Sequence, residues 1–103
     1  MGGQESSEQI FGDNKPYVLI DVREKDEWDS GHCNTAILIP SGQVRKEIES
    51  HVPDKNTKVL LYCRSGGRAG NCLNILKEMG YTNVHNLGGF SKAKSLVEQY
   101  PSP

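Results

Sequence analysis

The sequence predicts an α/β fold with three layers, in which a mainly parallel central sheet is covered by helices on both faces. Short apolar runs alternate with segments of helical periodicity along most of the chain. The runs are apolar throughout, which is typical of strands buried on both faces. The polar segments between successive runs are expected to be crossover connections, as parallel strands require.

The first half of the chain is expected to hold two strands and two helices. Residues 17–22 form a β-branched apolar run and predict a strand, and the charged residues 23–31 predict a short helix. Residues 36–40 predict a second strand, which ends at a proline. Ser41 is a suitable N-cap for a helix over 41–52, where apolar residues recur at every fourth position.

The second half repeats the alternation. Residues 58–63 predict a third strand, and residues 68–80 predict a helix that a glycine closes. Residues 83–87 predict a fourth strand, and the two glycines at 88–89 predict a turn. Residues 90–100 predict the last helix, which stops before a proline.

Length and composition indicate a single domain. A chain of 103 residues has room for one modest hydrophobic core. We expect residues 1–15 to be a flexible leader and residues 16–100 to form the domain. The net charge of -1 favours neither nucleic acid nor a membrane surface as a partner. No apolar run approaches the roughly 20 residues of a membrane helix.

Cysteine and histidine usage argues against a disulfide framework and against a metal site. The chain has three cysteines, Cys33, Cys63 and Cys72, and an odd number does not form a framework of pairs. Their spacing lacks the paired C-x-x-C of a structural zinc site. The three histidines, His32, His51 and His85, also lack a spacing suited to a metal, so we expect no metal site.

The stretch YCRSGGRAG, residues 62–70, has the composition of an anion-binding loop around a thiol. Cys63 ends a predicted parallel strand, which is where ligands bind in such folds. Glycines let successive N–H groups point inward, and a helix start adds positive potential. These effects lower the pKa of a thiol, so Cys63 is predicted to be a nucleophile. The residues expected to bind an anionic substrate are Arg64, Ser65, Gly66, Gly67 and Arg68.

Five motifs in order give the chain a family resemblance. They are LIDVRE at 19–24, EW at 27–28, GH at 31–32 followed by AILIP, YCRSGGR at 62–68 and LGGF at 87–90. Together the motifs resemble the single-domain rhodaneses, which are thiosulfate sulfurtransferases. The similarity spans residues 17 to 97, and it is strongest to the short bacterial rhodaneses of the phage shock protein E type.

The resemblance implies a rhodanese-like three-layer fold and a mechanism without a cofactor. Cys63 would take a sulfane sulfur from thiosulfate or a similar anionic donor and become a persulfide. Arg64 and Arg68 would attract the donor, and Asp21 and Arg23 would support the loop through an ion pair. Cyanide in the assay, a thiol in the cell, or a partner protein would accept the sulfur.

Several alternatives stay open at this point. The domain could instead carry a persulfide for a partner enzyme or have a regulatory role. A phosphatase or arsenate reductase is disfavoured, because the related phosphatases have a loop one residue longer than Cys63 to Arg68. Cys33 is expected to be a packing residue, and Cys72 is either a packing residue or a resolving thiol. We expect a monomer, periplasmic if a signal peptide was removed and otherwise cytoplasmic.

Overall fold

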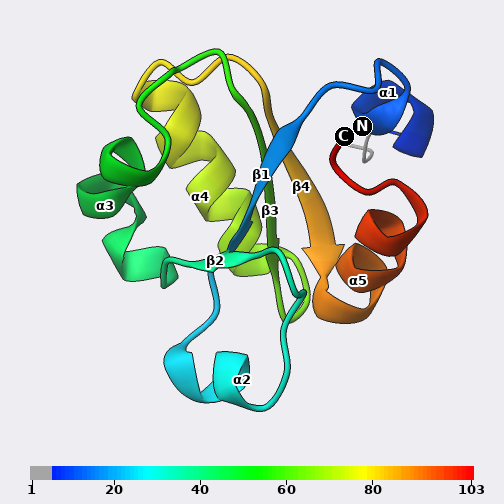
Figure 1. Cartoon of the computed structure of the whole chain (residues 1–103). Helices are drawn as coiled ribbons and strands as arrows, with labels where there is room; N and C mark the ends of the chain where they lie inside the picture. The colour runs from blue at the N-terminus through cyan, green and yellow to red at the C-terminus, as the bar shows by residue number, and fades with distance from the viewer. Residues whose placement is uncertain (1–5) are drawn as a thin grey trace.

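A computed structural model of the chain describes residues 6–103, and within them it shows one four-stranded sheet (Figure 1). The strand order is β2-β1-β3-β4, and every neighbouring pair is parallel. Each crossover carries at least one helix, so the predicted α/β class with a parallel sheet is confirmed. The strands are β1 (Tyr17–Asp21), β2 (Ile37–Leu38), β3 (Lys58–Cys63) and β4 (Val84–Gly89).

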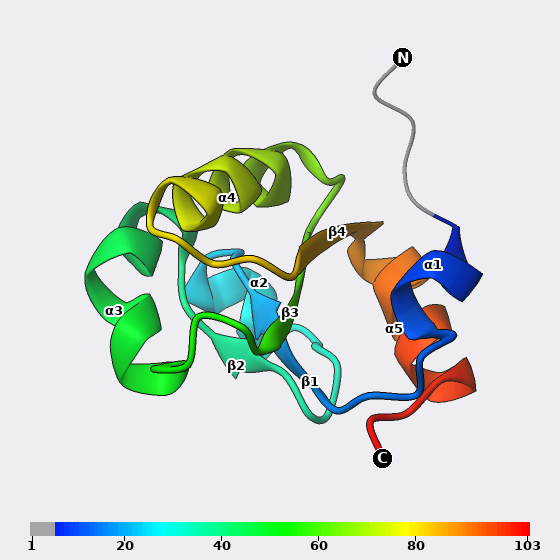
Figure 2. The ribbon, with the colours of Figure 1, turned by 90° about the horizontal axis from the view of Figure 1, so that it is seen from above.

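Helices cover both faces of this sheet (Figure 2). Helices α3 and α4 pack on one face, and α1 and α5 pack on the other. A short 3-10 turn, η1, precedes α3. The bounds are α1 (Ser7–Phe11), α2 (Lys25–Asp29), η1 (Ser41–Gln43), α3 (Val44–His51), α4 (Gly67–Glu78) and α5 (Phe90–Gln99).

The central strand β3 divides the core between the two faces. Its six residues are all buried, and successive side chains point to opposite sides. Val59, Leu61 and Cys63 pack with α3 and α4, whereas Leu60 and Tyr62 pack with α1 and α5. The alternation therefore turns the Cys63 side chain toward the face that α4 covers.

Two local predictions differ from the structure. Ser41 does not cap α3: it begins η1, which the Gln43 N–H closes onto the Pro40 carbonyl, and the helix starts three residues later. Gly88 and Gly89 do not form a turn. They continue β4 and lie opposite Tyr62 and Cys63 after a register shift in the β3–β4 ladder.

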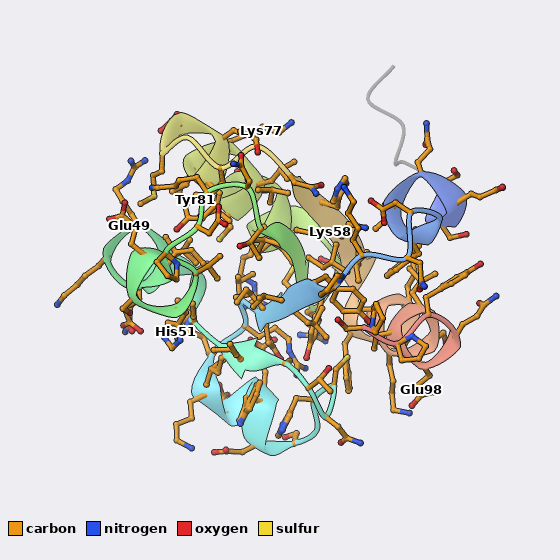
Figure 3. The ribbon with its side chains drawn as sticks, turned by 45° about the horizontal axis from the view of Figure 1, so that its top comes forward. Glu49, His51, Lys58, Lys77, Tyr81 and Glu98 are labelled. Carbon is orange, nitrogen blue, oxygen red and sulfur yellow. The ribbon has the colours of Figure 1, made fainter. Side chains whose placement is uncertain are left out.

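The described part of the predicted leader, residues 6–15, contains α1. Ser6 and Gln9 form a reciprocal capping box there, and Ile10 and Phe11 are buried. Lys58, labelled in Figure 3, donates from Nζ to the Ile10 carbonyl at 2.6 Å. Residues 1–5 lie outside the described residues, and the domain boundary at residue 16 stays a prediction.

None of the helices described is long and apolar enough to cross a membrane.

Candidate active site

Cys63 lies at the carboxyl end of β3, where the chain turns through three residues into α4 (Figure 1). Its Sγ accepts the N–H of Gly66 at 2.9 Å. Gly66 has a φ of +100°, a left-handed conformation that favours glycine, and it is the N-cap of α4. Only 1% of Cys63 is exposed, so the thiol lies at the bottom of the loop.

Two opposing effects act on the pKa of Cys63. Burial raises it, because a thiolate loses solvation away from water. Backbone hydrogen bonds from Ala69, Ser65, Gly66 and Arg68 outweigh burial and bring the pKa below its ordinary value. The predicted effect of the loop on the thiol is therefore present, and its source is the backbone N–H groups.

The end of β4 packs directly against the loop. A Cβ on Gly89 would lie 2.7 Å from the Arg64 carbonyl oxygen, closer than side chains approach backbone. A Cβ on Gly66 would lie 3.3 Å from the Cα of Gly88. Gly88 and Gly89, at the end of β4, thus allow this strand and the loop to approach each other although they are distant in sequence. The part of these glycines in the site could not be recognised from a turn-like sequence pattern.

Arg68 and Arg64 differ in their surroundings, although the sequence suggests the same task for both. The Arg68 guanidinium forms a bidentate pair with Glu27, Nη1 to Oε1 at 2.7 Å and Nη2 to Oε2 at 2.9 Å. This pair, with a backbone hydrogen bond at Glu24, lowers the pKa of Glu27 to about 2. Arg64 is exposed and has no ion pair within residues 6–103.

Glu27, the ion-pair partner of Arg68, was not among the site residues expected from the sequence. It lies on α2, a short helix with no buried residue. The pair with Arg68 connects this helix to the first turn of α4. Glu27 stands in the EW motif, and that motif was the only signal of its importance.

Asp21 and Arg23 form the predicted ion pair, Oδ2 to Nη2 at 2.8 Å, with both side chains buried. Arg23 also donates to the Gly31 carbonyl at 2.6 Å, and its guanidinium lies 4.5 Å from the centre of the Phe90 ring. Phe90 directly follows Gly89, which touches the loop. Among the contacts described, the Asp21–Arg23 pair makes no direct hydrogen bond to the loop. Its connection to the loop runs through Phe90.

The sequence model of the Rhodanese-like domain family matches residues 4–96, most of the chain. The chain belongs to this family. It is 46% identical over 70 residues to the thiosulfate sulfurtransferase PspE of Escherichia coli K12, covering 68% of this chain and 67% of PspE. It is 40% identical over 75 residues to the uncharacterized protein YqhL of Bacillus subtilis, covering 72% of this chain and 58% of YqhL.

Solved structures agree with the sequence relatives. A rhodanese with anions from E. coli superposes with a TM-score of 0.72 at 42% identity, covering 74% of this chain and 89% of that one. A thiosulfate sulfurtransferase from Pseudomonas aeruginosa gives 0.73 at 28% identity, covering 86% of this chain but 17% of that one. The predicted family and the rhodanese fold are therefore confirmed.

The other two thiols of this rhodanese domain are buried among apolar side chains. Burial raises the pKa of Cys33, whose backbone N–H donates to the Tyr62 hydroxyl at 3.1 Å. Burial and the nearby Cys63 raise the pKa of Cys72 to about 11. Both thiols are thus protonated at neutral pH, which favours packing for each. Within residues 6–103, no three histidine, cysteine or acidic residues gather around a possible metal position.

Proposed function

We propose that this chain moves a sulfane sulfur from thiosulfate, or a similar anionic donor, to a thiophilic acceptor through a persulfide on Cys63. One observation carries the proposal. The Cys63 sulfur is buried at the end of a parallel strand, yet a ring of backbone N–H groups holds its pKa low. A thiol whose ionisation is favoured in this way suits nucleophilic attack on the sulfane sulfur of an anionic donor.

The predicted class of enzyme, a sulfurtransferase, is confirmed by the family and by the similarity to PspE. A sulfur donor and a sulfur acceptor follow in general from this class. Which donor and which acceptor this chain uses in the cell is part of the proposal.

The first half-reaction uses the thiolate as nucleophile. The Cys63 sulfur attacks the outer sulfur of thiosulfate, a new S–S bond forms, and the original S–S bond breaks. Sulfite leaves with the bonding electron pair, and the terminal sulfur of the persulfide retains the negative charge. The N–H groups that stabilise the thiolate would also stabilise the negative charge on this terminal sulfur.

The second half-reaction restores the enzyme. Cyanide attacks the terminal sulfur, the S–S bond of the persulfide breaks, and thiocyanate leaves. The electron pair returns to Cys63 as a thiolate. A cellular thiol or a partner protein would take the place of cyanide.

The two arginines contribute differently to donor binding in this proposal. Arg64 is an exposed cation directly after Cys63 in the chain, so it attracts a dianionic donor. Arg68 directs its backbone N–H at the sulfur, while its guanidinium is held by Glu27. Ser65 and Gly66 supply further N–H groups, and Gly67 begins α4. Asp21 and Arg23 hold Phe90 and Gly31 beside the loop.

Intact mass spectrometry tests the proposal. The reduced protein should gain the mass of one sulfur atom after thiosulfate and lose it after cyanide, with thiocyanate as product. Cys63→Ser should take up no sulfur while keeping its fold. Uptake by that variant, or no uptake by the unsubstituted protein with Cys63 reduced, would refute the assignment. Sulfur uptake that only a protein partner removes would favour the persulfide carrier instead.

A further inference from the structure

Asn86 connects β4 to the loop around Cys63 through both ends of its side-chain amide. Its Nδ2 donates to the Gly66 carbonyl at 3.1 Å, and its Oδ1 accepts the Gly88 N–H at 2.8 Å. A donor at one end and an acceptor at the other fix the orientation of the amide. No motif of the sequence distinguishes this asparagine.

Gly66 is the residue that this contact holds. Its N–H donates to the Cys63 sulfur at 2.9 Å, while its carbonyl accepts from Asn86 and from the Gly70 N–H at 2.9 Å. The peptide group before its Cα therefore contacts the sulfur. The peptide group after it contacts Asn86 of β4 and Gly70 of α4. A glycine at positive φ has few steric limits of its own, so such partners define its conformation.

The sheet places Asn86 where it can make this contact. Asn86 pairs with Leu61, the last regular pair before the register shift. The shift adds one residue, Leu87, to β4, so that Gly88 comes to lie opposite Tyr62. The strand end then follows the loop closely, with the Cα of Gly88 near Gly66. Asn86 supplies the side-chain hydrogen bond across this approach.

We propose that Asn86 is a positioning residue for the Cys63 sulfur: it holds the Gly66 carbonyl and so keeps the Gly66 N–H directed at the sulfur. The proposal rests on the proposed function, because it concerns the sulfur that this function transfers. Asn86 acts through Gly66 and does not touch the reacting sulfur among the described contacts. Its loss should therefore weaken one of the hydrogen bonds that favour the thiolate.

Alkylation of Cys63 by iodoacetamide, followed across pH, measures this effect without any sulfur transfer. Asn86→Leu removes both hydrogen bonds at similar size. Without them the Gly66 N–H should no longer be held toward the Cys63 sulfur. The loss of that one hydrogen bond to the thiolate should raise the midpoint of the alkylation profile by roughly half to one pH unit. Cys63→Ser supplies the background rate from the two buried thiols. Asn74→Leu, an exposed asparagine on α4, is the matched control and should leave the midpoint unchanged.

Asn86→Asp keeps the acceptor toward Gly88 and removes the donor toward Gly66. We expect its midpoint to rise at least as far, because the variant loses the contact to Gly66 and also adds a negative charge beside the loop that holds the thiolate. If Asn86→Leu fails to fold, the smaller neutral variant Asn86→Ala decides the question, because the added charge of Asn86→Asp would raise the midpoint whether or not Asn86 positions Gly66. An unchanged midpoint in a folded variant would overturn the proposal, since a purely structural asparagine would change stability and leave the profile of Cys63 in place.

Thiocyanate formation by the unsubstituted protein separates the two proposals. A shifted midpoint without thiocyanate would support the positioning of the thiolate by Asn86 and refute the proposed sulfur transfer from thiosulfate to cyanide. Thiocyanate formation with unchanged midpoints in the Asn86 variants would support the proposed sulfur transfer and overturn the proposal that Asn86 positions the sulfur.

Discussion

Replacing Glu27 by glutamine tests whether its pair with Arg68 stabilises the domain around the loop. The amide side chain would keep the shape of the glutamate and lose its charge. The pKa of Glu27 falls from 4.5 to about 2 in the folded chain. A shift of this size corresponds to about 3 kcal/mol if all of it contributes to stability.

Solvent reduces this value. The Arg68 side chain is 35% exposed and that of Glu27 is 24% exposed, so the pair is partly screened. We therefore expect Glu27→Gln to lower the free energy of unfolding by about 1–2 kcal/mol at pH 7. Glu98→Gln is the matched control. Its carboxylate pairs with Lys94 at 2.7 Å, but both side chains are more than half exposed, and the change should be close to zero.

The pH dependence gives the sharper test, and its direction follows from the lowered pKa. The stabilisation is fully present above the unfolded pKa of 4.5 and is lost as the pH falls through the folded value of about 2. The difference between the original protein and Glu27→Gln in urea unfolding should thus shrink from pH 5 to pH 2. A difference that stays the same at pH 2, or none at pH 7, would refute the reasoning.

Three further substitutions probe the rest of the site. Arg64→Ala should raise the KM for thiosulfate several-fold with little change in kcat, because an exposed cation attracts donor and transition state alike; an unchanged KM in steady-state kinetics would contradict this. Gly89→Ala should destabilise the domain by about 1–3 kcal/mol in urea unfolding and slow sulfur transfer, since its Cβ would meet the Arg64 carbonyl. Equal stability would show that the loop moves aside freely. Cys72→Ser should leave thiocyanate turnover intact, and a large loss of turnover in the folded variant would indicate a resolving thiol.

Most of the fold was predictable because its signals are local. The apolar run of β3 and the glycine-rich stretch after it lie close together along the chain, so strand, loop and helix start follow from the sequence. The predicted flexible leader shows the limit of such reasoning. A polar segment gave no sign that Ile10 and Phe11 would be buried against the sheet.

The remaining features of the site depend on contacts between distant segments. Glu27 meets Arg68 across 41 residues, and Asn86 meets Gly66 across 20. The two glycines that end β4 look like a turn by composition, and only the pairing with β3 makes them strand residues that the loop packs against. Propensity describes neighbours along the chain, so it could not find any of these three contacts.

These contacts divide the electrostatics of the site between two sources. Glu27 offsets part of the charge of Arg68, so the net attraction of that guanidinium for the sulfur is reduced. Backbone N–H groups then stabilise the thiolate of buried Cys63, and water and salt screen their effect at a buried sulfur weakly. Exposed Arg64 provides an attraction that salt does screen. In the proposed function, the reactivity of Cys63 therefore depends on the folded loop, whereas the capture of an anionic donor depends on the ionic strength of the solution.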